Sequence, residues 1–171
     1  MISMLKRLKF ADFFTIGNFV CGIMAIILAI NENFLLSAII MLCAVMFDTL
    51  DGKIARYFNQ QNEMGKELDS LADIVSFGIW PAIFGYQLGL NSYYAIIILV
   101  FFSVCGMLRL ARFNVTDIKH FEGLPITANG LVFPAVYFIF WYNNLIFNEY
   151  ILLLYLFMAI FMVSSLRIRK I

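Results

Sequence analysis

The chain has 171 residues, of which 63% are apolar and only 13% charged, and its net charge at pH 7 is +1. Soluble domains carry roughly 45–50% apolar and about 25% charged residues, so this composition excludes an ordinary soluble enzyme. It also excludes disorder, which requires few apolar residues, and the near-neutral charge argues against nucleic-acid binding. The remaining class is an all-α, polytopic membrane protein with a single domain over residues 1–171.

Uncharged apolar stretches separated by short polar connections predict six membrane-spanning helices, since a spanning helix uses about 20 residues. The longest uncharged stretch, 74–108, is interrupted by a turn rich in Gly, Asn and Ser at 85–92 and therefore predicts two helices. The predicted spans are 12–31, 34–58, 66–86, 91–113, 126–145 and 149–167. Residues 1–10 mix basic and apolar side chains, which predicts a short amphipathic helix on the membrane surface.

The basic residues predict how the chain is oriented in the membrane. All twelve Lys and Arg residues lie before the first span, around the second and fourth connections, or after the last span. The other three connections contain no basic residue. Because cytoplasmic loops carry the excess of Lys and Arg, we expect a multi-pass protein of the cell membrane with both termini in the cytoplasm.

The carboxylates are concentrated around the second and third predicted helices, where six of the eleven lie between residues 48 and 73. At about 100° per residue, Asp48 and Asp51 share one face of the second helix, and Asp69 and Asp73 share one face of the third. Helices joined by a short connection are antiparallel neighbours, so the two acidic faces are expected to meet. Ionisable residues at membrane depth are costly, which makes these four functional candidates.

Four carboxylates that face each other in a low dielectric repel unless cations lie between them. The set contains no paired His or Cys, and oxygen ligands favour Mg²⁺, Mn²⁺ or Ca²⁺ over zinc or copper. Two such cations can hold a phosphoryl group between its attacking and leaving oxygens. Carboxylates in a membrane also occur in cation transporters, which is the alternative, although the position of the cluster at helix ends argues against it.

A longer motif surrounds these carboxylates. It reads Asp48-Thr-Leu-Asp51-Gly52-Lys-Ile-Ala55-Arg56 and then, after eight residues, Gly65, Asp69 and Asp73, with three residues between successive members. At every fixed position the motif resembles the signature of the CDP-alcohol phosphotransferases. The resemblance covers about residues 11–135 and implies a six-helix bundle that is usually a homodimer.

Three further segments resemble the phosphatidylserine synthases within that family. They are 69–82, 109–114 and 121–125. Ile74 follows the last Asp, where the glycerophosphate-transferring relatives usually have Lys. The resemblance thus implies transfer of a phosphatidyl or archaetidyl group from CDP-diacylglycerol or CDP-archaeol to the hydroxyl of L-serine, with release of CMP. Inositol phosphate and glycerol phosphate are the alternative acceptors.

The same resemblance implies a role for each residue of the motif. Asp48, Asp51, Asp69 and Asp73 would bind two divalent cations, Mg²⁺ or Mn²⁺, and Asp73 resembles the family's catalytic general base. The expected CDP-lipid-binding residues are Asn18, Gly52, Ala55, Arg56 and Gly65. The three small residues leave space for the nucleotide and Arg56 can pair with a phosphate. Asn18 fits an interhelical hydrogen bond equally well.

The acceptor pocket needs a cation, because serine carries a carboxylate. Arg109 and Arg112 are three residues apart and therefore lie on the same side of the fourth predicted helix, and Asn114 follows closely. These three residues are the predicted serine-binding residues, and the active site would face the cytoplasm. The alternative for both arginines is a role as anchors whose side chains reach the inner membrane surface.

Overall fold

The structure is a computed structural model that describes residues 9–58, 63–115, 123–145 and 147–164. Every regular element in these ranges is helical, which confirms the predicted all-α class. The elements are α2 (Phe10–Ile30), α3 (Phe34–Tyr57), α4 (Glu63–Asp73), a π-helical segment η1 (Ile74–Ile79), α5 (Trp80–Gln87), α6 (Tyr93–Val115), a 3₁₀ turn η2 (Ile126–Ala128), α7 (Asn129–Tyr142) and α8 (Ile151–Val163). The predicted amphipathic helix at 1–10 lies almost entirely outside the described residues.

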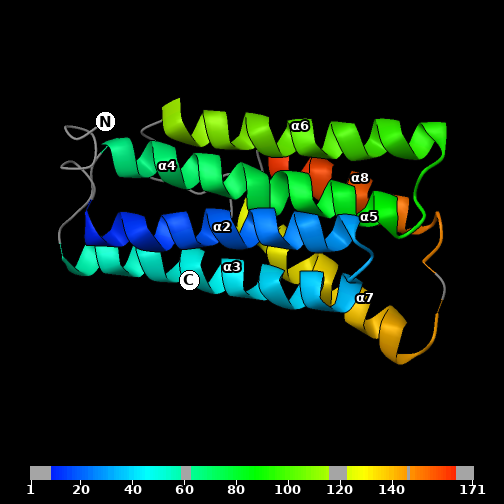
Figure 1. Ribbon diagram of the computed structural model, residues 1–171. Helices are drawn as coiled ribbons and strands as arrows, with labels where there is room; N and C mark the ends of the chain where they lie inside the picture. The colour runs from blue at the N-terminus through cyan, green and yellow to red at the C-terminus, as the bar shows by residue number, and fades with distance from the viewer. Residues whose placement is uncertain (1–8, 59–62, 116–122, 146, 165–171) are drawn as a thin grey trace.

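The helices lie side by side along one direction and form a bundle (Figure 1). α2 packs along α3, and the continuous run α4–η1–α5 packs against α2 on one side and α6 on the other. α8 packs against α6, and α7 against α3. α2 is therefore the helix that contacts both of the helices on which the acidic residues were predicted.

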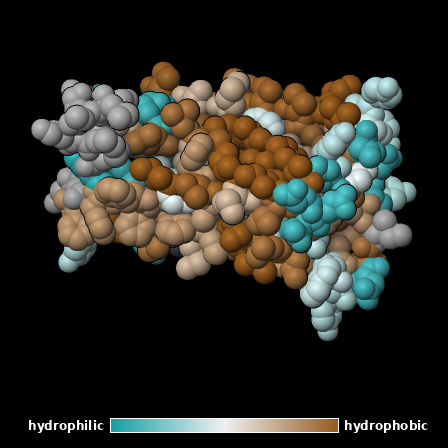
Figure 2. Space-filling model, in the orientation of Figure 1, coloured by the Kyte–Doolittle hydropathy of each residue, from teal (hydrophilic) through white to brown (hydrophobic). Residues whose placement is uncertain are grey.

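Four helices are long and apolar enough to cross a membrane: Phe10–Ile30, Phe34–Tyr57, Glu63–Gln87 and Tyr93–Val115. The middle of the molecular surface in Figure 2 is correspondingly hydrophobic, with hydrophilic residues towards its two ends. The last two predicted spans are apolar helices too, but they are shorter than expected. α7 has 14 residues and α8 has 13, or about 20 Å each, against a hydrocarbon core of about 30 Å. The count of six spans therefore stays a prediction.

The third helix contains a π-helical segment that the sequence did not predict. Pro81 has no N–H to donate to the carbonyl of Phe77, four residues earlier. The side-chain amide of Asn129 donates to that carbonyl instead, at 3.0 Å, and the hydroxyl of Ser103 donates to the carbonyl of Gly78 at 2.9 Å. The irregular segment is thus stabilised by side chains of two neighbouring helices, and it begins directly after Asp73.

α2 presents a buried stripe of small and polar residues to its neighbours. The stripe consists of Asp12, Thr15, Asn18, Gly22, Ala25 and Ala29. The helices come so close at Gly22 that a methyl group there would overlap the hydroxyl of Ser76. Small side chains allow such close approach in membrane bundles, where packing rather than water exclusion holds helices together.

Gly22→Ala should therefore lower the stability of the bundle, because overfilling a packed contact typically costs about 1–3 kcal/mol. The measurement is the melting temperature of the purified protein in detergent. Gly52→Ala is the matched control, since no atom lies within 4 Å of a methyl group at that position. Equal melting temperatures for the two variants would contradict the close packing of α2 against η1.

Candidate active site

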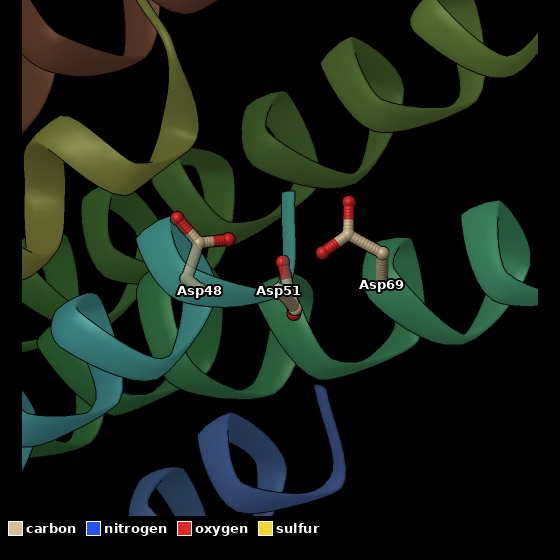
Figure 3. Close-up of side chains that lie close together, drawn as sticks. All are labelled: Asp48, Asp51 and Asp69. Carbon is tan, nitrogen blue, oxygen red and sulfur yellow. The ribbon is translucent and has the colours of Figure 1, made fainter. Parts of the chain in front are cut away.

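Three carboxylates from two antiparallel helices converge at one point of the bundle (Figure 3). Asp48 and Asp51 lie one turn apart on α3, and Asp69 lies on the facing side of α4. One carboxylate oxygen of each residue lies within 4.8 Å of the corresponding oxygens of the other two. The two acidic faces meet as the helical spacing predicted, so this geometric part of the prediction is confirmed.

Asp73 extends the cluster deeper into the bundle. Its side chain is only 7% exposed, and its carboxyl group lies within hydrogen-bonding reach of that of Asp48. One of its oxygens, Oδ1, accepts a hydrogen bond of 3.1 Å from the side-chain amide of Asn18 on α2. All four predicted carboxylates therefore belong to one cluster.

The composition of this cluster fits a bound cation. Oδ1 of Asp69 is buried and has no hydrogen-bond partner within the described ranges. The guanidinium of Arg109 on α6 is near enough to interact with Asp48 and Asp73, yet one positive charge does not balance four carboxylates. Unbalanced charge away from water is costly. Since every candidate metal-ligand atom in the cluster is a carboxylate oxygen, the arrangement suits hard divalent ions.

A cleft of about 610 Å³ opens directly from the cluster. It is lined by Ala11, Asp12, Thr15, Asp51, Gly52, Ala55, Arg56, Glu63, Gly65, Lys66, Asp69 and Phe113. Four of the five predicted CDP-lipid-binding residues line it. Gly52 borders open space, and the Arg56 side chain lies along α3, where its Nε donates to the carbonyl of Gly52 at 2.9 Å. The fifth, Asn18, is fully buried and makes the interhelical hydrogen bond to Asp73.

The three predicted serine-binding residues lie at the end of α6 in different surroundings. Arg109 is half-buried beside the acidic cluster, as described above. Arg112 instead donates to the carbonyls of Val163 and Ser164 at the end of α8, at 3.2 and 3.4 Å. Asn114 exchanges hydrogen bonds with Ser70 on α4, the shorter at 3.0 Å. Arg109 thus lies at the cluster, whereas Arg112 and Asn114 form contacts between helices.

Several polar residues at the site were missed by the sequence reasoning. Thr15 donates from Oγ1 to Oδ2 of Asp51 at 2.8 Å, and Lys66 donates to the backbone carbonyls of Phe113 and Asn114 on α6. Asp12 accepts from the backbone N–H of Lys9 at 2.8 Å and also lines the cleft. The three-residue spacing of Asp12, Thr15 and Asn18 in an apolar helix was the available signal.

Comparison with known proteins agrees with this geometry. Residues 8–166 match the family model described as CDP-alcohol phosphatidyltransferase. The chain belongs to that family. Its members are transferases, so family membership identifies the chain as an enzyme and disagrees with the alternative of a cation transporter.

Curated relatives of the chain occur in yeast, archaea and bacteria. A CDP-diacylglycerol–serine O-phosphatidyltransferase of Saccharomyces cerevisiae is 38% identical over 79% of the chain and 56% of its own length. One of the same name from Methanocaldococcus jannaschii is 35% identical over 99% of the chain and 78% of its own length. An archaetidylserine synthase of Methanothermobacter thermautotrophicus is 37% identical over 78% of the chain and 60% of its own length. The chain thus spans about half to three quarters of these relatives.

The carboxylate cluster predicts a requirement for divalent metal. Asp51→Asn keeps the size of the side chain but removes a charged ligand, so it should weaken Mn²⁺ binding by at least an order of magnitude, as measured by electron paramagnetic resonance titration. A chelator should abolish activity, and Mg²⁺ or Mn²⁺ should restore it. Glu149→Gln, which removes an exposed carboxylate outside the cluster, is the matched control. Full activity in excess chelator would contradict the metal site.

Proposed function

We propose that the chain transfers a phosphatidyl or archaetidyl group from a CDP-linked lipid to the hydroxyl of L-serine and releases CMP. The observation that carries this proposal is the carboxylate cluster at the mouth of a cleft lined by the family motif. The names of the relatives support serine as the acceptor and leave both CDP-diacylglycerol and CDP-archaeol as donors. An acceptor screen that scores release of CMP tests the proposal, and inert serine beside reactive inositol phosphate or glycerol phosphate would overturn it.

Asp48, Asp51 and Asp69, together with Asp73, would hold two divalent cations, for which Mg²⁺ and Mn²⁺ are the candidates. The buried oxygen of Asp69 that has no other partner supports this assignment. When bound, the cations would stabilise the negative charge that develops on the transferred phosphoryl group. The carboxylates would hold the cations in place because two helices, α3 and α4, fix the positions of these side chains.

The cleft beside the cluster is the proposed site of the CDP moiety. Gly52, Ala55 and Gly65 have little or no side chain, so the nucleotide can lie against the helix backbones. Arg56 and Lys66 line the same cleft and supply positive charge for the diphosphate. The acyl or isoprenoid chains would extend from there along the apolar surface of the bundle.

Asp73 is the proposed general base for the serine hydroxyl. It is buried and interacts with the other carboxylates of the motif, and one of its oxygens is already fixed by Asn18. The serine oxygen forms a bond to the phosphorus that bears the lipid, the bond from that phosphorus to CMP breaks, and Asp73 takes the hydroxyl proton. A proton acceptor in this role has to lie within hydrogen-bonding reach of the attacking hydroxyl.

Arg109 is the proposed partner of the serine carboxylate. Its guanidinium interacts with Asp73 and Asp48, so a serine bound by Arg109 would have its hydroxyl on the side of the proposed base. Arg112 and Asn114 would complete the acceptor pocket from the same helix end. Their present contacts with α8 and α4 fix the position of that end.

The setting of the reaction completes the proposal. All twelve basic residues lie at one side of the predicted topology, which supports a multi-pass protein of the cell membrane, with six spans and with both termini and the active site facing the cytoplasm. The family resemblance supports a homodimer. The CDP-lipid would then be supplied by the membrane itself, and serine by the cytoplasm.

Asp73→Asn should lower kcat by several orders of magnitude and change the KM for CDP-lipid by less than about threefold, because the proposed role lies in the chemical step. The measurement is steady-state release of CMP at varied CDP-lipid. Glu149→Gln is the control, since this exposed carboxylate lies outside both the cluster and the cleft. Turnover at the wild-type rate in Asp73→Asn would refute the assignment of the base.

Arg109→Ala should raise the KM for serine by roughly one to three decades, because loss of a buried charge pairing costs about 2–5 kcal/mol. The KM for CDP-lipid should change little. Arg112→Ala is the comparison: it should raise the KM for serine less than Arg109→Ala does, and loss of its hydrogen bonds to α8 should also lower the melting temperature. An unchanged KM for serine in Arg109→Ala would contradict the assignment of Arg109.

A further inference from the structure

The first membrane helix contributes two neutral hydrogen-bond donors to the acidic cluster, one to each acidic helix. Oγ1 of Thr15 donates to Oδ2 of Asp51 on α3 at 2.8 Å. Nδ2 of Asn18 donates to Oδ1 of Asp73, at the end of α4, at 3.1 Å. All four side chains are buried, with 0–7% of their surface exposed. Water therefore does not compete for these hydrogen bonds.

Each hydrogen bond fixes one oxygen of its carboxylate and thereby the direction of the other. A carboxylate that could rotate freely would lose part of its binding free energy when a ligand fixed its orientation. A neutral donor achieves this without adding a positive charge that would compete with a cation. A hydroxyl and an amide are thus better suited to this position than Lys or Arg would be.

The position of α2 is itself fixed at the same level. The hydroxyl of Ser76 donates to the backbone carbonyl of Asn18 at 3.2 Å, and Gly22 allows α2 to approach η1 closely. Hydroxyl groups in membrane helices commonly bond to a carbonyl one turn back in their own helix. Thr49 does so, with the carbonyl of Val45, whereas the Thr15 hydroxyl is directed across to Asp51.

We propose that Thr15 and Asn18 are positioning residues: Thr15 sets the metal affinity of the cluster through Asp51, and Asn18 sets the turnover through Asp73. This inference rests on the proposed function. It assigns to α2 a part in the reaction without direct contact with the reacting atoms, and it places Asn18 on the base rather than on the diphosphate. Groups that orient metal ligands typically contribute 10–100-fold to metal affinity or activity.

The test of Thr15 is a Mn²⁺ titration of the purified protein, followed by electron paramagnetic resonance without substrate. Thr15→Val keeps the shape but removes the donor and should raise the Kd for Mn²⁺ about 10–100-fold. Thr15→Ser restores the donor and should stay within about threefold of wild type. Thr49→Val is the control. Among the described contacts, the Thr49 hydroxyl bonds only within its own helix, so this variant should bind Mn²⁺ as wild type does.

The outcomes separate this inference from the proposed function. A wild-type protein that binds no Mn²⁺ would overturn both. Wild-type binding with an unchanged Kd in Thr15→Val would overturn the role of Thr15 alone, as would an equal loss in Thr15→Ser. Should Thr15→Val fail to fold, Thr15→Ala carries the same expectation, with folding checked by the melting temperature.

The test of Asn18 is a split between kcat and KM. Asn18→Leu should lower kcat about 10–100-fold and leave the KM for CDP-lipid within about threefold, when both are measured at saturating Mn²⁺. A higher KM for CDP-lipid with an unchanged kcat would show instead that Asn18 binds the diphosphate. Unchanged kinetics would show a purely structural hydrogen bond, and either result would overturn the role proposed here.

Discussion

Mutual repulsion among four carboxylates, enclosed by a bundle of mostly apolar helices, is the constraint on which the rest of this structure depends. Such a cluster is unfavourable unless charge and hydrogen bonds compensate it. α6 supplies a guanidinium through Arg109, and α2 supplies two neutral donors through Thr15 and Asn18. The remaining excess of negative charge makes the site suited to divalent ions. The repulsion that destabilises the free protein would therefore also favour binding of the cations.

The surrounding helices keep the cluster together by satisfying polar groups at places where regular structure breaks. The side chains of Asn129 on α7 and Ser103 on α6 donate hydrogen bonds to the backbone carbonyls of Phe77 and Gly78, just before Pro81. Tyr155 on α8 donates to the carbonyl of Pro81 itself at 2.6 Å. In a membrane each unpaired backbone group costs several kcal/mol. Three helices outside the motif, α6, α7 and α8, thus help to determine the course of the helix that carries Asp69 and Asp73.

The sequence was sufficient for the acidic site because that site depends on local periodicity. Asp48 with Asp51, and Asp69 with Asp73, share a helical face at 100° per residue whatever surrounds them. Thr15 and Asn129 were not predicted in their observed roles, because their partners lie 36 and 52 residues away and depend on tertiary packing. Hydropathy also overestimated the length of the last two helices, because α7 ends at Tyr142, just before Asn143 and Asn144, and α8 ends at Val163.

The π-helical segment has a consequence for how this protein can change in length. Asp69 and Asp73, before Ile74, belong to the acidic cluster, whereas Phe77, Trp80 and Phe84 beyond it fill the apolar core. Deleting or inserting one residue between these two halves would rotate one against the other by about 100°. Either the carboxylates or the aromatic side chains would then face the wrong neighbours. The spacing between Asp73 and Pro81 is therefore a fixed length, and variation in chain length has to occur in the connections at the ends of the bundle.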